Sequence, residues 1–194
     1  MFSPVVEQAL RVSAAAHAGQ FRKGPDRVHY ATHPMHVALM LAKWGFDDDV
    51  IAAGLLHDVV EDCESWTFPR VEEQFGTHIA SIVRQLTEDE SSPWEERKRT
   101  AIDQVSQLSP EAASVKAVDK LHNLRCLLDE LQMASDPESV WARYTASRER
   151  TLAMDAELVE ALAKRTDSRL GRALRETYES IVEQDCTSPS APTI

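Results

Sequence analysis

The sequence has few cysteines, no long apolar run and a shortage of positive charge. Its three cysteines, Cys63, Cys126 and Cys186, are widely spaced, which favours a reducing compartment over a disulfide framework and matches no zinc-ribbon spacing. No apolar run approaches the roughly 20 residues that a membrane-spanning helix needs. Residues 1–19 also lack the basic start and the apolar core of a signal peptide. Together these absences predict a cytoplasmic protein.

The charge balance limits the possible partners. Lysine and arginine total 21 against 32 aspartates and glutamates, which gives a formal net charge of −11. A chain of this charge has no general attraction to nucleic-acid backbones or anionic membranes, so we expect neither as a partner. Any phosphate group that it binds must therefore meet a local cluster of basic side chains.

Length and pattern predict a single all-α domain, and they do not indicate an oligomeric state. We expect the domain over residues 1–183 and a disordered tail over 184–194, which offers almost nothing to bury. No alternating strand pattern and no internal repeat is evident. Gly24 with Pro25 and the Ser-Ser-Pro at 91–93 predict loops over 20–32 and 87–94. Apolar residues recur at helical spacing over 5–13, 37–44, 51–59, 79–86, 117–131 and 152–162, which predicts a helical bundle of about eight or more helices.

The stretch LLHDVVED, residues 55–62, ends one of these apolar segments in a dense polar group. If the helix continues through it, His57 pairs with Glu61 and Asp58 pairs with Asp62 on neighbouring strips of one face. The crowded carboxylates repel one another, and a divalent cation or protonation relieves that repulsion. Solvated residues at a frayed helix end are the alternative explanation.

Two polar positions elsewhere extend the metal hypothesis. His33 lies at the start of the helical stretch THPMHVALML, and Asp119 lies within the apolar pattern of VKAVDKLHNLRCLL. With His57 and Asp58 they offer two imidazoles and two carboxylates, a mixed set that suits manganese, iron or zinc. Such a site requires three separate helices to converge at one point.

Ordinary structural roles are open for the same residues. His33 alone fits a helix-capping or packed imidazole. Asp119 fits a plain salt bridge to Lys120 or Arg125, because buried charges are usually paired. Spacing along the chain does not distinguish these roles from metal binding.

The order of these residues resembles the signature of the HD-domain metal-dependent phosphohydrolases: a histidine, a His-Asp pair and a distant aspartate. AAAHAGQFRKG, HYATHPMHVALML, AAGLLHDVVED and SVKAVDKLHNLRCL resemble the hydrolase domain of the RelA/SpoT family and its stand-alone relatives, the small alarmone hydrolases of the Mesh1 type. The resemblance covers about residues 7–165 and includes no synthetase or regulatory domain. It implies an all-α HD-domain bundle that removes the 3′-pyrophosphate of guanosine tetra- and pentaphosphate, giving GDP or GTP and pyrophosphate.

The resemblance also implies roles for individual residues. The matching metal ligands, for manganese or another divalent ion, are His33, His57, Asp58 and Asp119. Glu61 and Asp62 match the acidic pair that orients or activates the attacking water. Arg22 and Lys23 match the basic pair at the rim of the pocket, and Lys98 falls where the family supplies a cation to the phosphates. Tyr30 and Asn123 match residues that line the nucleoside side.

Each residue that is a candidate for substrate binding also has an ordinary structural role open to it. Arg148 is a further candidate cation on this acidic chain, although a solvated surface charge is the ordinary role of any single lysine or arginine. Tyr30 could stack on a base or pack beside His33. His17 also matches the family pattern and is expected to brace the loop that follows it.

Some positions depart from the family pattern. Cys63 stands where a threonine is common, and His29 stands where a proline usually precedes the tyrosine. The stretch 147–159 lacks the aromatic residues of many relatives, which puts substrate contacts from that helix in doubt.

Two other functions stay open. An HD enzyme with the same metal site could act on another phosphorylated nucleotide, such as an adenosine alarmone or the 2′-phosphate of NADPH. A non-catalytic nucleotide sensor is the other alternative, and it predicts loss of a ligand or of the acidic pair. All four ligand matches and both acidic residues are present in the sequence, which favours an enzyme.

Overall fold

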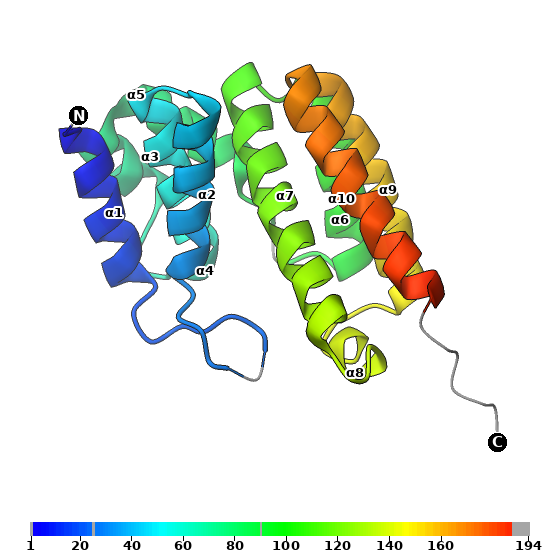
Figure 1. Ribbon diagram of the computed structural model, residues 1–194. Helices are drawn as coiled ribbons and strands as arrows, with labels where there is room; N and C mark the ends of the chain where they lie inside the picture. Colours follow the sequence, from blue (N-terminus) through cyan, green and yellow to red (C-terminus); the bar gives the residue numbers. More distant parts are fainter. Residues whose placement is uncertain (1, 25, 90, 188–194) are drawn as a thin grey trace.

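The structure is a computed structural model that describes residues 2–24, 26–89 and 91–187, and these form a bundle of helices (Figure 1). The helices are α1 (Pro4–Ala16), α2 (Thr32–Trp44), α3 (Asp48–Leu56), α4 (Val59–Asp62), α5 (Phe68–Leu86), α6 (Trp94–Gln104), the 3₁₀ helix η1 (Val105–Gln107), α7 (Pro110–Met133), α8 (Glu138–Trp141), α9 (Arg148–Arg165) and α10 (Ser168–Thr187). Within the described ranges, the only β-structure is an isolated antiparallel bridge between Phe21 and His29. The predicted all-α class is confirmed, and none of the described helices is long and apolar enough to cross a membrane.

The tight connection between α2 and α3 places two histidines at the same end of the bundle. Gly45 ends α2 with a left-handed φ of 86°, a conformation that glycine adopts without strain. Asp47 then caps α3 by accepting a hydrogen bond from the Val50 amide at 3.1 Å. The two helices therefore pack in opposite directions, so His33 at the start of α2 lies near His57 at the end of α3.

Helix α7 is the central element of the bundle. In Figure 1 it runs between a group formed by α1 to α5 and the pair α9 and α10, and it contacts α2, α3, α5, α9 and α10. Its apolar side chains are buried in the core: Val115, Val118, Leu121, Leu124, Leu128 and Leu131. Asp119 and Asn123 lie beside this apolar face and are only half-buried. Helix α7 thereby carries polar side chains to the ends of α2 and α3.

Two boundaries differ from the sequence-based expectation. The helix does not continue through LLHDVVED: α3 ends at Leu56 and α4 begins at Val59. His57 Nδ1 donates a hydrogen bond to the Gly54 carbonyl at 2.8 Å, and in a continuing helix the Asp58 amide would use that carbonyl. At the other end of the chain, residues 184–187 of the predicted tail belong to α10, and 188–194 lie outside the described residues.

The close packing of α9 on α10 depends on Gly171. A Cβ atom at this position would lie 2.8 Å from the Ala163 carbonyl oxygen, which is backbone and cannot rotate away. We expect Gly171→Ala to lower the free energy of unfolding by about 1–3 kcal/mol, as measured by urea denaturation. Arg172→Ala, at the exposed neighbouring position, is the control. An unchanged denaturation midpoint for Gly171→Ala would contradict this packing.

Candidate metal centre and substrate site

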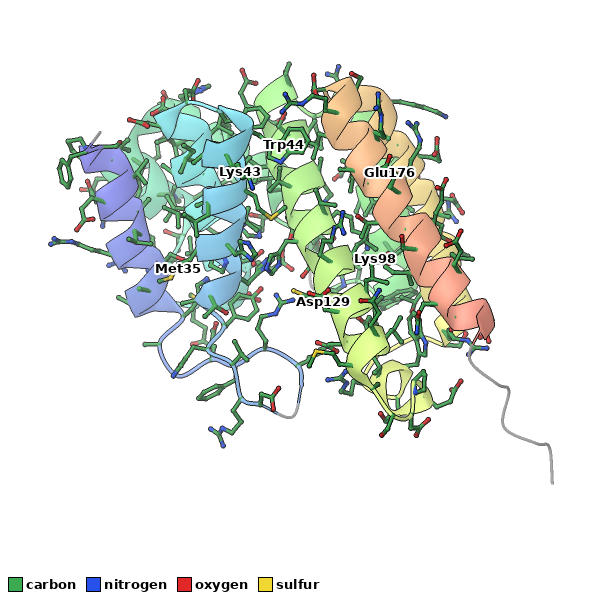
Figure 2. All side chains as sticks on the ribbon, in the orientation of Figure 1. Met35, Lys43, Trp44, Lys98, Asp129 and Glu176 are labelled. Carbon is green, nitrogen blue, oxygen red and sulfur yellow. The ribbon has the colours of Figure 1, made fainter. Side chains whose placement is uncertain are left out.

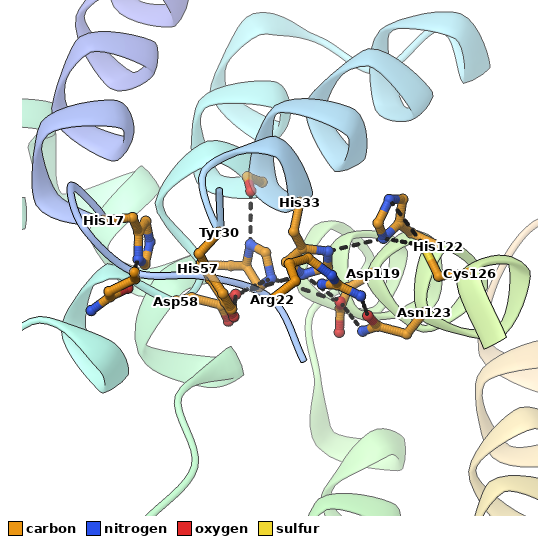
Figure 3. Close-up of polar contacts among 12 residues, drawn as sticks. His17, Arg22, Tyr30, His33, His57, Asp58, Asp119, His122, Asn123 and Cys126 are labelled. Atoms are coloured by element: carbon orange, nitrogen blue, oxygen red, sulfur yellow. Dashed lines mark hydrogen bonds and ion pairs between the residues drawn. The ribbon is translucent and has the colours of Figure 1, made fainter. Parts of the chain in front are cut away.

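The four side chains predicted as metal ligands meet at one point, where the start of α2, the end of α3 and the middle of α7 come together (Figure 3). His33 Nε2 lies 3.1 Å from Asp119 Oδ1 and 3.6 Å from Asp58 Oδ2. His57 Nε2 lies 3.1 Å from Asp58 Oδ2 and 3.8 Å from Asp119 Oδ1. Both imidazoles are buried, with exposed fractions of 2% and 6%. His33, His57 and Asp58 each place one possible ligand atom within 4.8 Å of the others, and Asp119 adds a carboxylate oxygen close to both imidazoles.

The hydrogen bonds of the two imidazoles leave their Nε2 atoms facing the carboxylates. His57 donates from Nδ1 to the Gly54 carbonyl, and His33 Nδ1 lies 2.9 Å from His122 Nδ1. Among the described residues, no hydrogen bond of suitable geometry reaches the buried His57 Nε2, which faces the carboxylates of Asp58 and Asp119. A buried imidazole nitrogen that lacks such a hydrogen bond beside two carboxylates fits a divalent cation, for which this mixed donor set is suitable.

The pKa values of His57 and Asp119 are shifted in the directions that favour positive charge at the site. Burial alone would lower the pKa of His57, but the carboxylates of Asp58 and Asp119 raise it well above its usual value. Burial would raise the pKa of Asp119, but hydrogen bonds from His33 and His57 hold it well below its usual range. Both effects favour ionised carboxylates with positive charge beside them. A divalent cation would satisfy the same electrostatic demand.

Asp119 has no lysine or arginine as its partner in the described part of the chain. Lys120, one of the two residues considered for a salt bridge, pairs with Asp155 on α9 instead. Asn123 donates from Nδ2 to Asp119 Oδ1 at 2.8 Å, and Arg22 Nη2 donates to Asn123 Oδ1 at 3.0 Å. Arg22 therefore contacts Asp119 only through Asn123, and the plain salt bridge is excluded for Lys120.

Tyr30 packs beside His33, which was one of its two possible roles. Its ring centroid lies 5.8 Å from that of His33 and 4.8 Å from that of His17. Its hydroxyl donates to Asp58 Oδ2 at 2.7 Å. Burial, reinforced by the charges of Asp58 and Asp62, raises the pKa of Tyr30. The hydroxyl thus stays protonated and orients the Asp58 carboxylate.

This contact leads to a prediction for metal affinity. We expect Tyr30→Phe to weaken Mn²⁺ binding by about tenfold, because the carboxylate of Asp58 loses its donor while the ring packing is kept. Isothermal titration of the metal-free protein measures the change. Tyr178→Phe is the matched control, since the Tyr178 hydroxyl donates to the Leu152 carbonyl, a contact outside the metal ligands. Equal affinity in Tyr30→Phe and wild type would show that Tyr30 does not orient Asp58.

The acidic pair lies on α4, just after the break in the helix. Glu61 Oε2 accepts a hydrogen bond from the Glu88 amide at 3.0 Å. Burial, together with the nearby charges of Glu88 and Asp58, raises the pKa of Glu61 to about 7, although the Glu88 amide opposes the shift. Asp62 is exposed. Glu61 can therefore exchange a proton near neutral pH, as a general base must.

His17 braces the segment that carries the acidic pair, and it acts through Gln20. His17 Nδ1 lies 2.6 Å from Gln20 Oε1, and Gln20 Nε2 donates to the Asp62 carbonyl at 2.9 Å. Cys63, which replaces the usual threonine, lies with its Sγ 3.4 Å from the Ala16 carbonyl. The C-terminal end of α1 is thereby tied to the end of α4.

Two cavities flank the candidate metal ligands, and both contain basic side chains. One of about 220 Å³ is lined by Lys98, Lys116, Lys120, Glu88, Asp119 and Asn123, among others. The other, of about 360 Å³, is lined by Arg22, Lys23, Tyr30, Asn123, Arg143 and Tyr144, among others. Asn123 and Tyr144 line both. The larger cavity is locally basic, whereas the lysines of the smaller one are matched by Glu88, Asp119 and Asp155.

The predicted cations differ in their placement. Lys98 lies between α7 and the α9–α10 pair in Figure 2, and its Nζ contacts the two carboxylate oxygens of Glu88 at 2.9 and 3.0 Å. Arg148 contacts Glu138 at 2.9 Å and Asp185 at 3.4 Å, and it lines neither of the two cavities. The structure therefore does not bring Arg148 to the site.

Sequence reasoning gave no role to some residues that contact the site. Gln20 and Glu88 lie in loops that show no apolar periodicity. Gln20 contacts the backbone carbonyl of Asp62, and Glu88 contacts Glu61 through its own backbone amide. Tyr144 follows α8 in a short irregular stretch. His122 also contacts a ligand, and its position three residues after Asp119 on α7 is the sequence signal that connects it to the site.

Comparisons of the sequence with known proteins point to one family. Residues 9–151 match the family described as HD domain. The curated guanosine-3′,5′-bis(diphosphate) 3′-pyrophosphohydrolase MESH1 of Drosophila melanogaster is 35% identical over 158 residues, which is 78% of this chain and 88% of that protein. MESH1 of Homo sapiens is 41% identical over 122 residues, covering 62% of this chain and 68% of that protein.

Solved structures show the same likeness. A metazoan ortholog of SpoT that hydrolyzes ppGpp and plays a role in starvation responses superposes with a TM-score of 0.79 and 31% sequence identity, covering 92% of this chain and 96% of that chain. The protein lmo0812 from Listeria monocytogenes EGD-e superposes with a TM-score of 0.66 and 28% identity, covering 76% of this chain and 99% of that chain. The similarity therefore extends over nearly all of the bundle.

Proposed function

The chain belongs to the HD-domain family, and we propose that it is a metal-dependent hydrolase that removes the 3′-pyrophosphate of guanosine tetra- and pentaphosphate. The products are GDP or GTP and pyrophosphate. The observation that carries the proposal is the convergence of His33, His57, Asp58 and Asp119 beside two cavities that contain basic side chains. Glu61 follows on α4. The names of the relatives and of the metazoan structure support the same substrate.

His33, His57, Asp58 and Asp119 would hold the metal ion, and we favour Mn²⁺ among the divalent ions. Their nitrogen and oxygen donors suit that ion, and among the described residues the buried His57 Nε2 faces the carboxylates of Asp58 and Asp119 without a hydrogen bond of suitable geometry. When bound, the ion polarises a phosphoryl oxygen and acidifies water. Tyr30 keeps the Asp58 carboxylate oriented by donating to Oδ2.

The acidic pair handles the attacking water. Glu61, with its pKa raised to about 7, accepts a proton from that water at neutral pH. Asp62 orients the water from the end of α4, and Gln20 holds its backbone. Because α3 breaks before α4, Glu61 and Asp62 are placed by the turn at His57 and Asp58 rather than by one continuous helix.

Basic side chains offset the negative charge of the phosphates. Lys98 is available in the smaller cavity, where Glu88 is its partner, and a substrate phosphate can replace that carboxylate. Arg22 and Lys23 line the larger cavity with Tyr30 and Asn123. We assign this cavity to the nucleoside side of the substrate. Such cations stabilise charge that develops on transferring phosphoryl groups.

Lys98 gives a test of this assignment. We expect Lys98→Gln to raise the KM for guanosine tetraphosphate by about 10- to 100-fold, which corresponds to the loss of one hydrogen bond between charged groups. Steady-state kinetics at saturating Mn²⁺ measure the effect. Arg99→Gln is the control, because Arg99 pairs with Glu157 on the exposed face of α6 and α9. A KM that is unchanged in Lys98→Gln would remove Lys98 from the phosphate site.

Composition supports the expected setting of the enzyme. The net charge of −11 argues against nucleic acids and anionic membranes as partners. The few, widely spaced cysteines fit the reducing cytoplasm. The partner that we propose is therefore a small nucleotide substrate.

One experiment tests the substrate assignment. Mn²⁺-loaded protein is incubated separately with guanosine tetraphosphate, its adenosine analogue and NADPH, and the products are identified by anion-exchange chromatography. We expect GDP and pyrophosphate from guanosine tetraphosphate, formed faster than product from the other two. Release of orthophosphate from NADPH, with no pyrophosphate from either alarmone, would overturn the proposal.

A further inference from the structure

We infer that His122 is a positioning residue for the metal centre: its Nδ1 accepts a hydrogen bond from the Nδ1–H of His33 and so fixes His33 in the tautomer whose Nε2 can bind the ion. The inference rests on the metal dependence of the proposed function. Figure 3 shows His122 joined to His33 on the side of that ring away from His57 and Asp58, so it is not itself one of the proposed ligands.

The contact between the two histidines is short and buried. The two Nδ1 atoms lie 2.9 Å apart, and the ring centroids lie 4.8 Å apart. His33 is 2% exposed and His122 is 6% exposed, so water has little access to either ring. Two imidazole nitrogens at this distance share one proton, with one ring as the donor and the other as the acceptor.

The direction of the hydrogen bond follows from the other side of the His33 ring. His33 Nε2 faces Asp119 at 3.1 Å and Asp58 at 3.6 Å, and it can bind a cation only when it carries no proton. A neutral His33 then carries its proton on Nδ1, and this Nδ1–H donates a hydrogen bond to His122 Nδ1. The opposite tautomer would place a proton at the position of the ion.

The surroundings of His122 agree with its role as the acceptor. With Nδ1 accepting, a neutral His122 carries its proton on Nε2. Cys126 Sγ lies 3.7 Å from that nitrogen and 3.9 Å from Nδ1, and sulfur is a weak hydrogen-bond acceptor that can serve the Nε2–H. One pair of tautomers therefore satisfies the contacts of His33, His122 and Cys126 together.

The two metal-facing imidazoles are thus held in different ways. His57 is fixed by the Gly54 carbonyl, which is backbone and does not change with substitution. His33 is fixed by a side chain that can be replaced. Outer partners of ligating histidines typically contribute about 10- to 100-fold to metal affinity, so the effect of His122 is measurable.

His122 acts through His33 and is not itself part of the lining of the substrate cavities. It lines a groove of about 880 Å³ with His36 and Thr32, among others, and this groove adjoins the larger substrate cavity at Arg22 and Lys23. His122 does not line the cavities of about 220 and 360 Å³ beside the ligands. Substitution of His122 should therefore change the Mn²⁺ requirement and leave the KM for the nucleotide at saturating Mn²⁺ close to that of wild type.

Three variants separate the acceptor role from simple packing. In His122→Asn the side-chain oxygen is bonded to Cγ, as Nδ1 is in histidine, so an acceptor stays near the same position. In His122→Gln the acceptor lies one bond further along the side chain. In His122→Leu the size is similar but no acceptor is left. Isothermal titration of the metal-free proteins with Mn²⁺ measures the affinity, and thermal unfolding of the same samples checks the fold.

We expect His122→Leu and His122→Gln to bind Mn²⁺ about 10- to 100-fold more weakly than wild type, and His122→Asn to restore most of the affinity. Wild-type affinity in His122→Leu would overturn the inference, and so would an affinity in His122→Asn as low as in His122→Leu. If the leucine variant does not fold, the difference between the asparagine and glutamine variants decides. A wild-type protein that binds no Mn²⁺ would overturn this inference and the proposed function together. The expected series in a protein that does not hydrolyse the alarmone would support this inference and overturn the substrate assignment alone.

Discussion

Asp58→Ala is expected to lower the turnover of guanosine tetraphosphate by about 10³-fold or more, since a metal ion contributes several kcal/mol to the stabilisation of such a transition state. Asp58 Oδ2 lies 3.1 Å from His57 Nε2 and 3.6 Å from His33 Nε2. Its removal takes away one oxygen ligand and also the acceptor of the Tyr30 hydroxyl. The remaining two histidines and Asp119 make a weaker site.

The measurement combines steady-state rates with the metal content of the purified protein. Asp48→Ala is the matched control, because Asp48 is exposed in the first turn of α3, at the opposite end of the helix from Asp58. We expect this control to keep both its turnover and its metal. Full turnover with a wild-type metal content in Asp58→Ala would show that the site is assigned incorrectly.

Glu61→Gln is expected to reduce kcat by about 10²- to 10⁴-fold, the usual contribution of a general base. Metal affinity should stay near that of wild type, because the side chain of Glu61 accepts from the Glu88 amide and is not one of the four proposed ligands. The variant therefore separates loss of the base from loss of the ion, which Asp58→Ala does not.

The pH dependence of the rate gives a second readout for Glu61. The carboxyl group must be ionised to act as a base, and its pKa is raised to about 7. The wild-type rate should fall as the pH drops through about 7, and Glu61→Gln should lose that fall. Glu64→Gln, at an exposed position near the end of α4, is the control and should keep the wild-type profile. An unchanged kcat in Glu61→Gln would exclude Glu61 as the base.

The fold could be predicted wherever local chemistry decides it. The apolar spacing of α7 and the aspartate cap of α3 both indicate their helices directly. The break between α3 and α4 could not be predicted from spacing, because it accompanies one side-chain hydrogen bond, from His57 to the Gly54 carbonyl. Competition of this kind between a side chain and the helix backbone depends on rotamer and burial, which a sequence pattern does not contain.

The proposed ligands could be identified because each is a polar residue on an otherwise apolar helix, in an order that resembles a known family. Their convergence could not be predicted, because it depends on the antiparallel packing of α2 and α3 and on the position of α7. Positive charge is the only sequence feature that makes Arg148 a candidate for the site. In the structure its partners are Glu138 and Asp185, on α8 and α10, and charge in a sequence does not indicate which partner it will meet.

The most direct test of the metal-dependent site is a titration of metal-free protein with Mn²⁺ in which bound metal and release of pyrophosphate from guanosine tetraphosphate are followed together. We expect activity to rise in proportion to bound Mn²⁺, and Asp119→Asn to show both weaker binding and less product. Asp119 lies 3.1 Å from His33 Nε2 and accepts from Asn123, so this change keeps the size of the side chain and removes its charge. Pyrophosphate release at the full rate before any Mn²⁺ is bound, or in Asp119→Asn without bound metal, would contradict this expectation.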